Sequence, residues 1–152
     1  MSYAYNCIGP DDEPRMRDEH AFLERQLAEV IELERAGDPH AAQLIWNVFT
    51  RELEQHMQYE ERLLFPACAA SGEIAAARIE RLCAEHVRLR NRCRELSSAP
   101  LHAAHRSEQL AELARAMQAH TQGEQTVLFP WLQSLRQAKS TWSVLRLSAA
   151  GH

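Results

Sequence analysis

The segment HMQYEERLLFP at residues 56–66 returns as HTQGEQTVLFP at residues 120–130. The two copies share the pattern H-x-Q-x-E-x-x-x-L-F-P, so six of their eleven positions are identical. A shorter pattern, E-H-x-x-L, links residues 19–23 with residues 85–89. The chain therefore contains two related halves, and each half has a histidine in its first segment and an H-x-x-x-E motif in its second.

Both halves have the hydrophobic periodicity of amphipathic helices. Four helices are expected, over about residues 14–36, 38–66, 73–96 and from a start between 100 and 107 to 130. No stretch between turn signals alternates in the manner of a strand. A two-helix hairpin cannot bury its own apolar face, but two hairpins can bury theirs against each other. We therefore predict an all-α fold, an up-down-up-down antiparallel four-helix bundle with a short C-terminal extension.

The chain of 152 residues has the size of one domain. We expect an N-terminal segment at residues 1–13, the bundle at 14–136 and a C-terminal tail at 137–152, the tail forming a short fifth helix or an arm packed on the bundle. Within the predicted helices, Pro66 and Pro130 are expected to end or kink the second and fourth.

The composition excludes several classes of function. The net charge of −4 disfavours a nucleic-acid partner, which requires a basic face. No apolar run approaches the roughly 20 residues of a membrane span, and no secretory signal is visible, so a cytoplasmic location is expected. The four cysteines form no C-x-x-C pair, which disfavours a disulfide framework.

Six polar residues lie on the apolar stripes that should face the bundle core. Residues four apart share a helix face, so His56 points the same way as Glu60, and His120 the same way as Glu124. Apolar residues precede and follow each of these four residues at helical spacing. The histidines of the other two helices are spaced from apolar residues in the same way. The complete set is His20, His56, Glu60, His86, His120 and Glu124.

Burying these groups without partners is unfavourable by roughly 2–7 kcal/mol for each neutral polar group, and by more for a charge. Two divalent cations would compensate, since imidazole nitrogens can bind them and carboxylates can bridge them. The nitrogen and oxygen donors, with no thiolate among them, suit iron, manganese or zinc. Hydrogen-bonded core histidines are the alternative for each position taken singly, but the duplication of the set favours metal binding.

Other metal motifs do not fit the spacing. Ferritin-like proteins need Glu-x-x-His, and none of the four histidines has a glutamate three residues before it. The H-E-x-x-H motif of zinc proteases is absent. Cys83 and His86 form a C-x-x-H motif without a second cysteine unit, so Cys83 and Cys93 are expected to be small core residues.

The pattern resembles the hemerythrin-like, or HHE cation-binding, domain over about residues 14–133. This resemblance implies four helices around a non-haem di-iron centre with an oxo or hydroxo bridge. It also implies that the four histidines are terminal ligands and that Glu60 and Glu124 bridge the irons. Zinc or manganese could replace iron.

Two positions depart from the oxygen-carrying hemerythrins. Arg90 stands where they have a further histidine, and Gln125 stands where they have an aspartate, the acid here being Glu124. The set is similar to the four-His, two-Glu variant of bacterial HHE proteins. This departure puts reversible oxygen carriage in doubt, although the likeness to a di-iron site remains.

Several neighbouring residues have two interpretations each. Tyr59 and Glu61 are expected to be exposed, with contact to the site as the alternative. Glu19 and Glu85 could accept a hydrogen bond from a ligand histidine, but only one on a neighbouring helix, because adjacent residues point about 100° apart. Phe65 and Phe129 are expected to pack beside the site or simply in the core. Solvent histidines are expected at positions 40, 102, 105 and 152, and packing tryptophans at 46, 131 and 142.

The predicted function is that of a di-iron protein that binds or senses O₂, NO or peroxide, or that stores or donates iron. Two alternatives stay open. One is an enzyme with weak peroxidase or NO-reducing activity at the same centre, and the other is a helical interaction module that binds zinc or no metal. The expected partner is a small diatomic or peroxide ligand, and no protein partner is predicted.

Overall fold

The structure, a computed structural model, describes residues 8–9, 11–98 and 105–149, and it describes side chains as far as residue 138. The described part is helical and contains no strand. The helices are α1 (Asp12–Arg35), α2 (Pro39–Tyr59), α3 (Phe65–Ala69), α4 (Glu73–Ser98) and α5 (Arg106–Ala149). A π-helical segment, η2 (Glu60–Leu64), joins α2 to α3 without a break.

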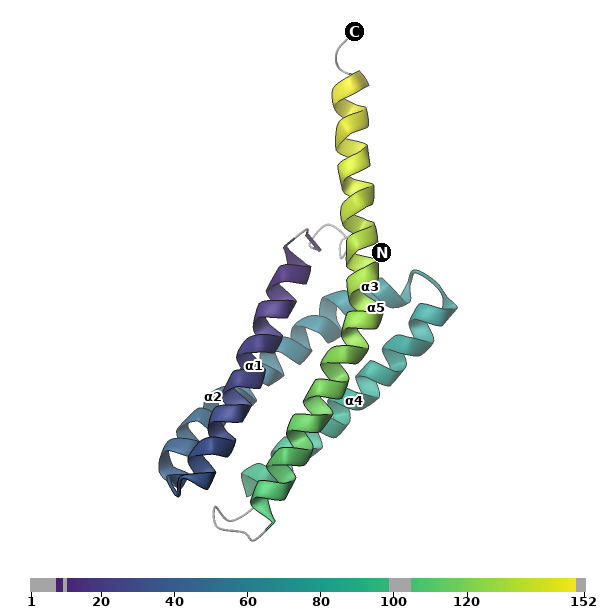
Figure 1. Cartoon of the computed structure of the whole chain (residues 1–152). Coiled ribbons are helices and arrows are strands. Elements are labelled where there is room, and N and C mark those ends of the chain that lie inside the picture. Colours follow the sequence, from purple (N-terminus) through teal and green to yellow (C-terminus); the bar gives the residue numbers. More distant parts are fainter. Residues whose placement is uncertain (1–7, 10, 99–104, 150–152) are drawn as a thin grey trace.

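The helices form an antiparallel bundle in which α1 lies beside α2 and α5, and α4 lies beside α3 and α5 (Figure 1). The predicted fold class is therefore confirmed. None of the helices in the described part of the chain combines the length and apolarity needed to cross a bilayer.

Three residues, Gly37, Asp38 and Pro39, make the turn between α1 and α2. Gly37 takes a positive φ of 76°, a conformation that is unstrained only for glycine, and so reverses the chain after α1. Asp38 then caps α2 by accepting a hydrogen bond of 3.0 Å from the Ala41 N–H, and Pro39 occupies the first helical position.

Pro66 and Pro130 were expected to end or kink their helices, and neither helix ends at its proline. A proline inside a helix lacks an N–H and crowds the carbonyl four residues before it. Ahead of Pro66 the chain widens into η2, in which the Phe65 N–H donates to the Glu60 carbonyl, and the helix continues to Ala69. Pro130 lies on the exposed side of α5, where water can reach the carbonyl that it leaves unpaired.

The C-terminal extension is a continuation of α5. It projects beyond the other helices in Figure 1, and residues 137–149 form neither a separate fifth helix nor an arm folded back on the bundle. The end of the predicted tail, residues 150–152, lies outside the described residues.

The apolar core has two parts. One cluster includes Leu23, Leu53, Leu89 and Met117, and lies toward the α1–α2 turn. The other cluster lies toward the opposite end of the bundle. It includes one residue from the apolar stripe of each predicted helix: Met16, Leu64, Leu82 and Leu128. The six predicted ligands lie between these two sets in the sequence of every helix, so they form a polar layer between two apolar layers.

Candidate metal centre

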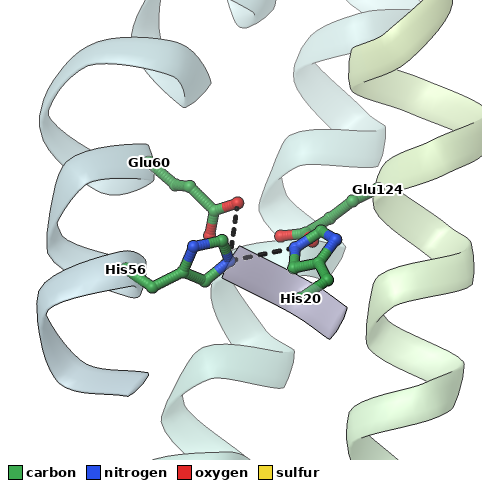
Figure 2. Close-up of side chains that lie close together, drawn as sticks. All are labelled: His20, His56, Glu60 and Glu124. Atoms are coloured by element: carbon green, nitrogen blue, oxygen red, sulfur yellow. Dashed lines mark hydrogen bonds and ion pairs between the residues drawn. The ribbon is translucent and has the colours of Figure 1, made fainter. Parts of the chain in front are cut away.

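All six predicted ligands come together inside the bundle. They form two groups whose donor atoms lie within 4.8 Å of one another, and both groups share Glu60 and Glu124. The six residues are between 0% and 5% exposed. Figure 2 shows one group, with its side chains pointing toward one another. The first group adds His20 and His56 to the shared carboxylates, and the second adds His86 and His120.

Each group contains a close pair of imidazole nitrogens. The Nε2 atoms of His20 and His56 are 3.0 Å apart, as are those of His86 and His120. Two ligands at right angles around an ion, each about 2.1 Å from it, are about 3.0 Å apart. The spacing is therefore the one that two neighbouring metal ligands would have.

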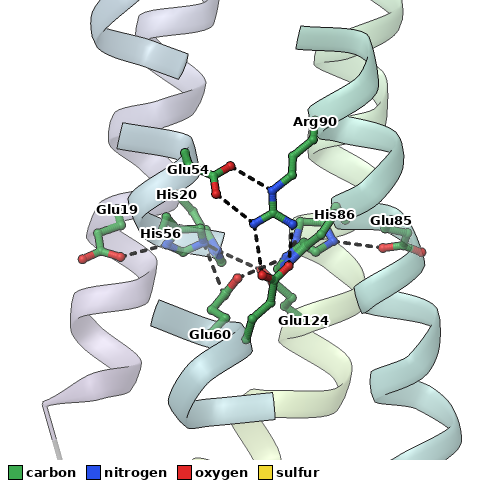
Figure 3. A network of polar contacts seen from close by, with 11 residues as sticks. Glu19, His20, Glu54, His56, Glu60, Glu85, His86, Arg90 and Glu124 are labelled. Atoms are coloured by element: carbon green, nitrogen blue, oxygen red, sulfur yellow. Dashed lines mark hydrogen bonds and ion pairs between the residues drawn. The ribbon is translucent and has the colours of Figure 1, made fainter. Parts of the chain in front are cut away.

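Three of the four imidazoles are oriented by a carboxylate on a neighbouring helix, and Figure 3 shows the pair formed by His56 and Glu19. The Nδ1–oxygen distances are 2.8 Å for His56 and Glu19, 3.0 Å for His120 and Glu85, and 2.8 Å for His86 and Glu61.

Glu19 and Glu85 each contact a histidine on a neighbouring helix. This agrees with the expectation that either glutamate could accept a hydrogen bond only from a ligand histidine on another helix. The expectation that Glu61 is simply exposed is wrong, because its side chain is only 31% exposed and contacts His86. The only sequence signal for Glu61 was its position next to Glu60 of the motif. That position did not indicate which helix the Glu61 side chain would contact.

These contacts fix which nitrogen carries the proton in a neutral ring. A carboxylate only accepts hydrogen bonds, so each bonded Nδ1 donates, and the Nε2 of the same neutral ring carries a lone pair. In the second group, the Nε2 lone pairs of His86 and His120 consequently face each other at 3.0 Å. Two lone pairs at this distance repel unless a proton or a metal ion lies between them, and the raised pKa of His86 shows that its ring can carry such a proton in the absence of metal. The donor set therefore fits a metal ion.

The two shared carboxylates are the most deeply buried charges in the site. Glu60 and Glu124 are both 0% exposed, and none of their four oxygens has a hydrogen-bond partner of good geometry among the described residues. Glu60 lies 3.3 Å from Nε2 of both His56 and His86, one in each group. Oxygens aimed at imidazole nitrogens without being hydrogen-bonded to them are arranged as bridging ligands would be.

Electrostatics in the centre favour cations. Burial and the neighbouring Glu124 raise the pKa of Glu60, while the contacts of Glu124 with His120 and His20 outweigh burial and hold its pKa well below the usual range. Burial alone would lower the pKa of His86, but its contacts with Glu124 and Glu60 raise it to about 9. The same negative field would attract a divalent ion.

Arg90, which replaces a histidine of the oxygen carriers, anchors the surroundings of the second group. Its guanidinium lies 2.6 Å from Glu61 and 2.8 Å from Glu54, and so joins α4 to α2 and η2. Figure 3 shows the contact with Glu54. The pKa of Glu61 is lowered despite its partial burial, because Arg90 and His86 both donate hydrogen bonds to it. Glu61 is therefore held as a carboxylate facing His86.

Aromatic rings close the centre on one side. The Phe65 ring stacks on His86 with centroids 5.1 Å apart, and the Phe129 ring stacks on His20 at 6.4 Å. The two phenylalanines of the repeat thus pack beside the site, which was one of the two expectations, and both also belong to the second core cluster, the other expectation. Tyr59 was expected to be exposed, but it is half-buried, donates to Asp12 and lies under the Arg15 guanidinium, and it belongs to neither donor group.

The remaining histidines, cysteines and tryptophans lie outside the two groups. His40 and His105 are exposed as predicted, while His102 and His152 lie outside the described residues. Cys83 and Cys93 are half-buried and pack against the core clusters, as expected of small core residues. The tryptophans that the structure describes pack against the two clusters, Trp46 fully and Trp131 partly buried, and the side chain of Trp142 lies outside the described part.

A helical bundle with two buried groups of imidazoles and shared carboxylates defines a candidate cation-binding protein. The family model described as Hemerythrin HHE cation binding domain matches residues 12–132, and the chain therefore belongs to this family. Neither the comparison with curated proteins nor the comparison with solved structures gave a match.

Proposed function

We propose that the six residues hold two iron ions and that the iron pair binds O₂, NO or peroxide. The observation that supports two ions is the arrangement of the donors in two groups that share both carboxylates. Each ion would have two imidazoles together with carboxylate oxygens. This combination with open positions is typical of non-haem iron that reacts with oxygen.

The Nε2 atoms of His86 and His120, which face each other at 3.0 Å beside two buried carboxylates, carry the proposal. The carboxylates Glu61 and Glu85 hold the Nδ1 sides of these two rings, so both Nε2 atoms point into the site beside the shared carboxylates. The pair is therefore arranged for a cation.

The protein side of the chemistry is positioning and exclusion of water. Glu19, Glu61 and Glu85 orient the imidazoles, and Phe65 and Phe129 give the centre an apolar boundary. The iron pair would supply open coordination positions and electrons to a small ligand. An apolar boundary favours small neutral molecules such as O₂ and NO over charged ones.

Binding or sensing is the role that this burial supports best. Glu60, His86 and Glu124 are 0% exposed, so releasing an ion would require the bundle to open. Iron storage or donation is the second role, and it would depend on that opening for release of the ion.

The test is to load the purified full chain with Fe(II) without oxygen, count metal, and then record visible and near-ultraviolet spectra after adding air or NO. We expect two irons per chain and new charge-transfer bands. The matched variants are His120→Ala, which removes a donor, and His40→Ala, which removes an exposed histidine.

Fewer than about one iron per chain in the wild type would reject the proposal. Retention of zinc in preference to iron, or full thermal stability without any metal, would favour an interaction module. Steady-state peroxide or NO consumption far above that of His120→Ala would favour the enzyme.

A further inference from the structure

We propose that the two metal positions are unequal. The position formed with His86 and His120, here called the α4–α5 position, fills first and binds more tightly. The position formed with His20 and His56, the α1–α2 position, fills second and exchanges its ion more readily. This inference rests on the proposed function, since it assumes that two ions bind.

The two halves of the site differ at one nitrogen. Nδ1 of His20 is buried and has no hydrogen-bond partner among the described residues, whereas the Nδ1 atoms of the other three ligand histidines each have a carboxylate. Both imidazoles of the α4–α5 position are therefore oriented, but only one imidazole of the α1–α2 position is.

The sequence repeat shows where the missing partner would be. Glu61 follows His56 by five residues and contacts His86, and the equivalent residue after His120 is Gln125, which is exposed. Arg90 holds Glu61 in place, and the residue that matches Arg90 in the other half is the exposed Glu24. The pair of Arg90 and Glu61 therefore supports the α4–α5 position. Its equivalent in the other half is Glu24 and Gln125, both of which are exposed.

The orienting carboxylates strengthen metal binding at the position that has them. A carboxylate on the second nitrogen fixes the ring and raises its basicity, and removal of such a partner typically weakens metal binding by about 10–100-fold. The α4–α5 position has two such partners, Glu61 and Glu85, and the α1–α2 position has one, Glu19.

The donors also differ in what they can do without an ion. Because Nδ1 of His20 has no partner among the described residues, this ring can carry its proton on Nε2 and donate it to Nε2 of His56 at 3.0 Å. His86 and His120 have no such arrangement in their neutral forms, since the protons of both rings are on Nδ1. In their neutral forms, therefore, only the rings of the α1–α2 position share a hydrogen bond that an entering ion must displace.

The experiment is a Co(II) titration of the metal-free full chain, followed by the visible absorption of bound Co(II) and by calorimetry. Two steps are expected, with dissociation constants that differ by about tenfold or more. The variant His20→Ala should keep the tight step and lose the weak one, and His120→Ala should lose the tight step.

The variant Glu61→Gln tests the cause of the inequality. It should weaken the tight step by about 10–100-fold and leave the weak step unchanged. Its matched control is Gln125→Ala at the equivalent position in the other half, which should leave both steps unchanged. The two ligand variants assign the steps even if Glu61→Gln fails to fold.

Two ions that bind with equal affinity, or a tight step that survives His120→Ala but is lost in His20→Ala, would overturn this inference while leaving the proposed metal pair intact. Absence of Co(II), Fe(II) and Zn(II) binding would instead refute the pair itself.

Discussion

Replacing Glu60 by glutamine should change the stability of the metal-loaded protein and that of the metal-free protein in different ways. Glu60 is 0% exposed, lies in both donor groups, and is 3.3 Å from a nitrogen of each. Glutamine has nearly the same shape but no charge, so it leaves no cavity. The variant Glu60→Gln should therefore lose the stabilisation from both ions.

The magnitude follows from mass action. A ligand that binds only the folded state at a free concentration 100 times its dissociation constant stabilises by about 2.7 kcal/mol. Two such ions contribute about 5.4 kcal/mol, and at about 2–4 °C per kcal/mol for a chain of this size the expected loss of Tm is about 10–20 °C.

In the metal-free protein, the same substitution should not lower Tm. Burial and the neighbouring Glu124 raise the pKa of Glu60, which means that its charged form is unfavourable in the folded state. Removing that charge relieves repulsion between two buried carboxylates, so metal-free Glu60→Gln should unfold at no lower temperature than metal-free wild type.

Differential scanning calorimetry with saturating metal and with chelator measures both effects. The control is Glu29→Gln, which makes the same chemical change at an exposed position of α1. A wild-type Tm that does not depend on metal, or a metal-free Glu60→Gln protein that is several degrees less stable than wild type, would refute the reasoning.

Three further predictions concern the bundle itself. Trp46→Phe removes a 3.0 Å hydrogen bond from the indole to the Ser97 hydroxyl and part of a fully buried ring, and should lower the free energy of unfolding by about 1–3 kcal/mol in urea titrations without changing the metal content. Pro130→Ala restores a backbone donor inside α5 and should stabilise the protein by up to about 3 kcal/mol, whereas a lower midpoint in the same titration would show that the proline is required there. Asp38→Ala removes the hydrogen bond to the Ala41 N–H that caps α2 and should cost about 0.5–2 kcal/mol, with Asp38→Asn as a control that keeps most of the capping.

The local pattern was sufficient to predict the helices and the donor set. Residues three, four and seven apart share a helix face, so the stripes around His56 and Glu60 could be read without knowing what they pack against. The repeat then matched each H-x-x-x-E motif with a second histidine. The cap at Asp38 was predictable for the same reason, because it involves residues only three apart.

The prolines show where local rules were insufficient. The two copies of L-F-P are identical in sequence, but Pro66 follows a π-helical segment and Pro130 lies inside a continuous α-helix. Proline disfavours a regular helix by the same amount at both sites, so the surrounding packing decided how each was accommodated.

The sequence by itself determined that six imidazole and carboxylate groups face the core of a four-helix bundle, because helical periodicity is a property of neighbouring residues. Only the tertiary structure decided that Glu61 reaches His86 and that His20 has no such partner among the described residues. The physical reason is that contacts between helices depend on their rotation and relative height, and these follow from the packing of the whole core.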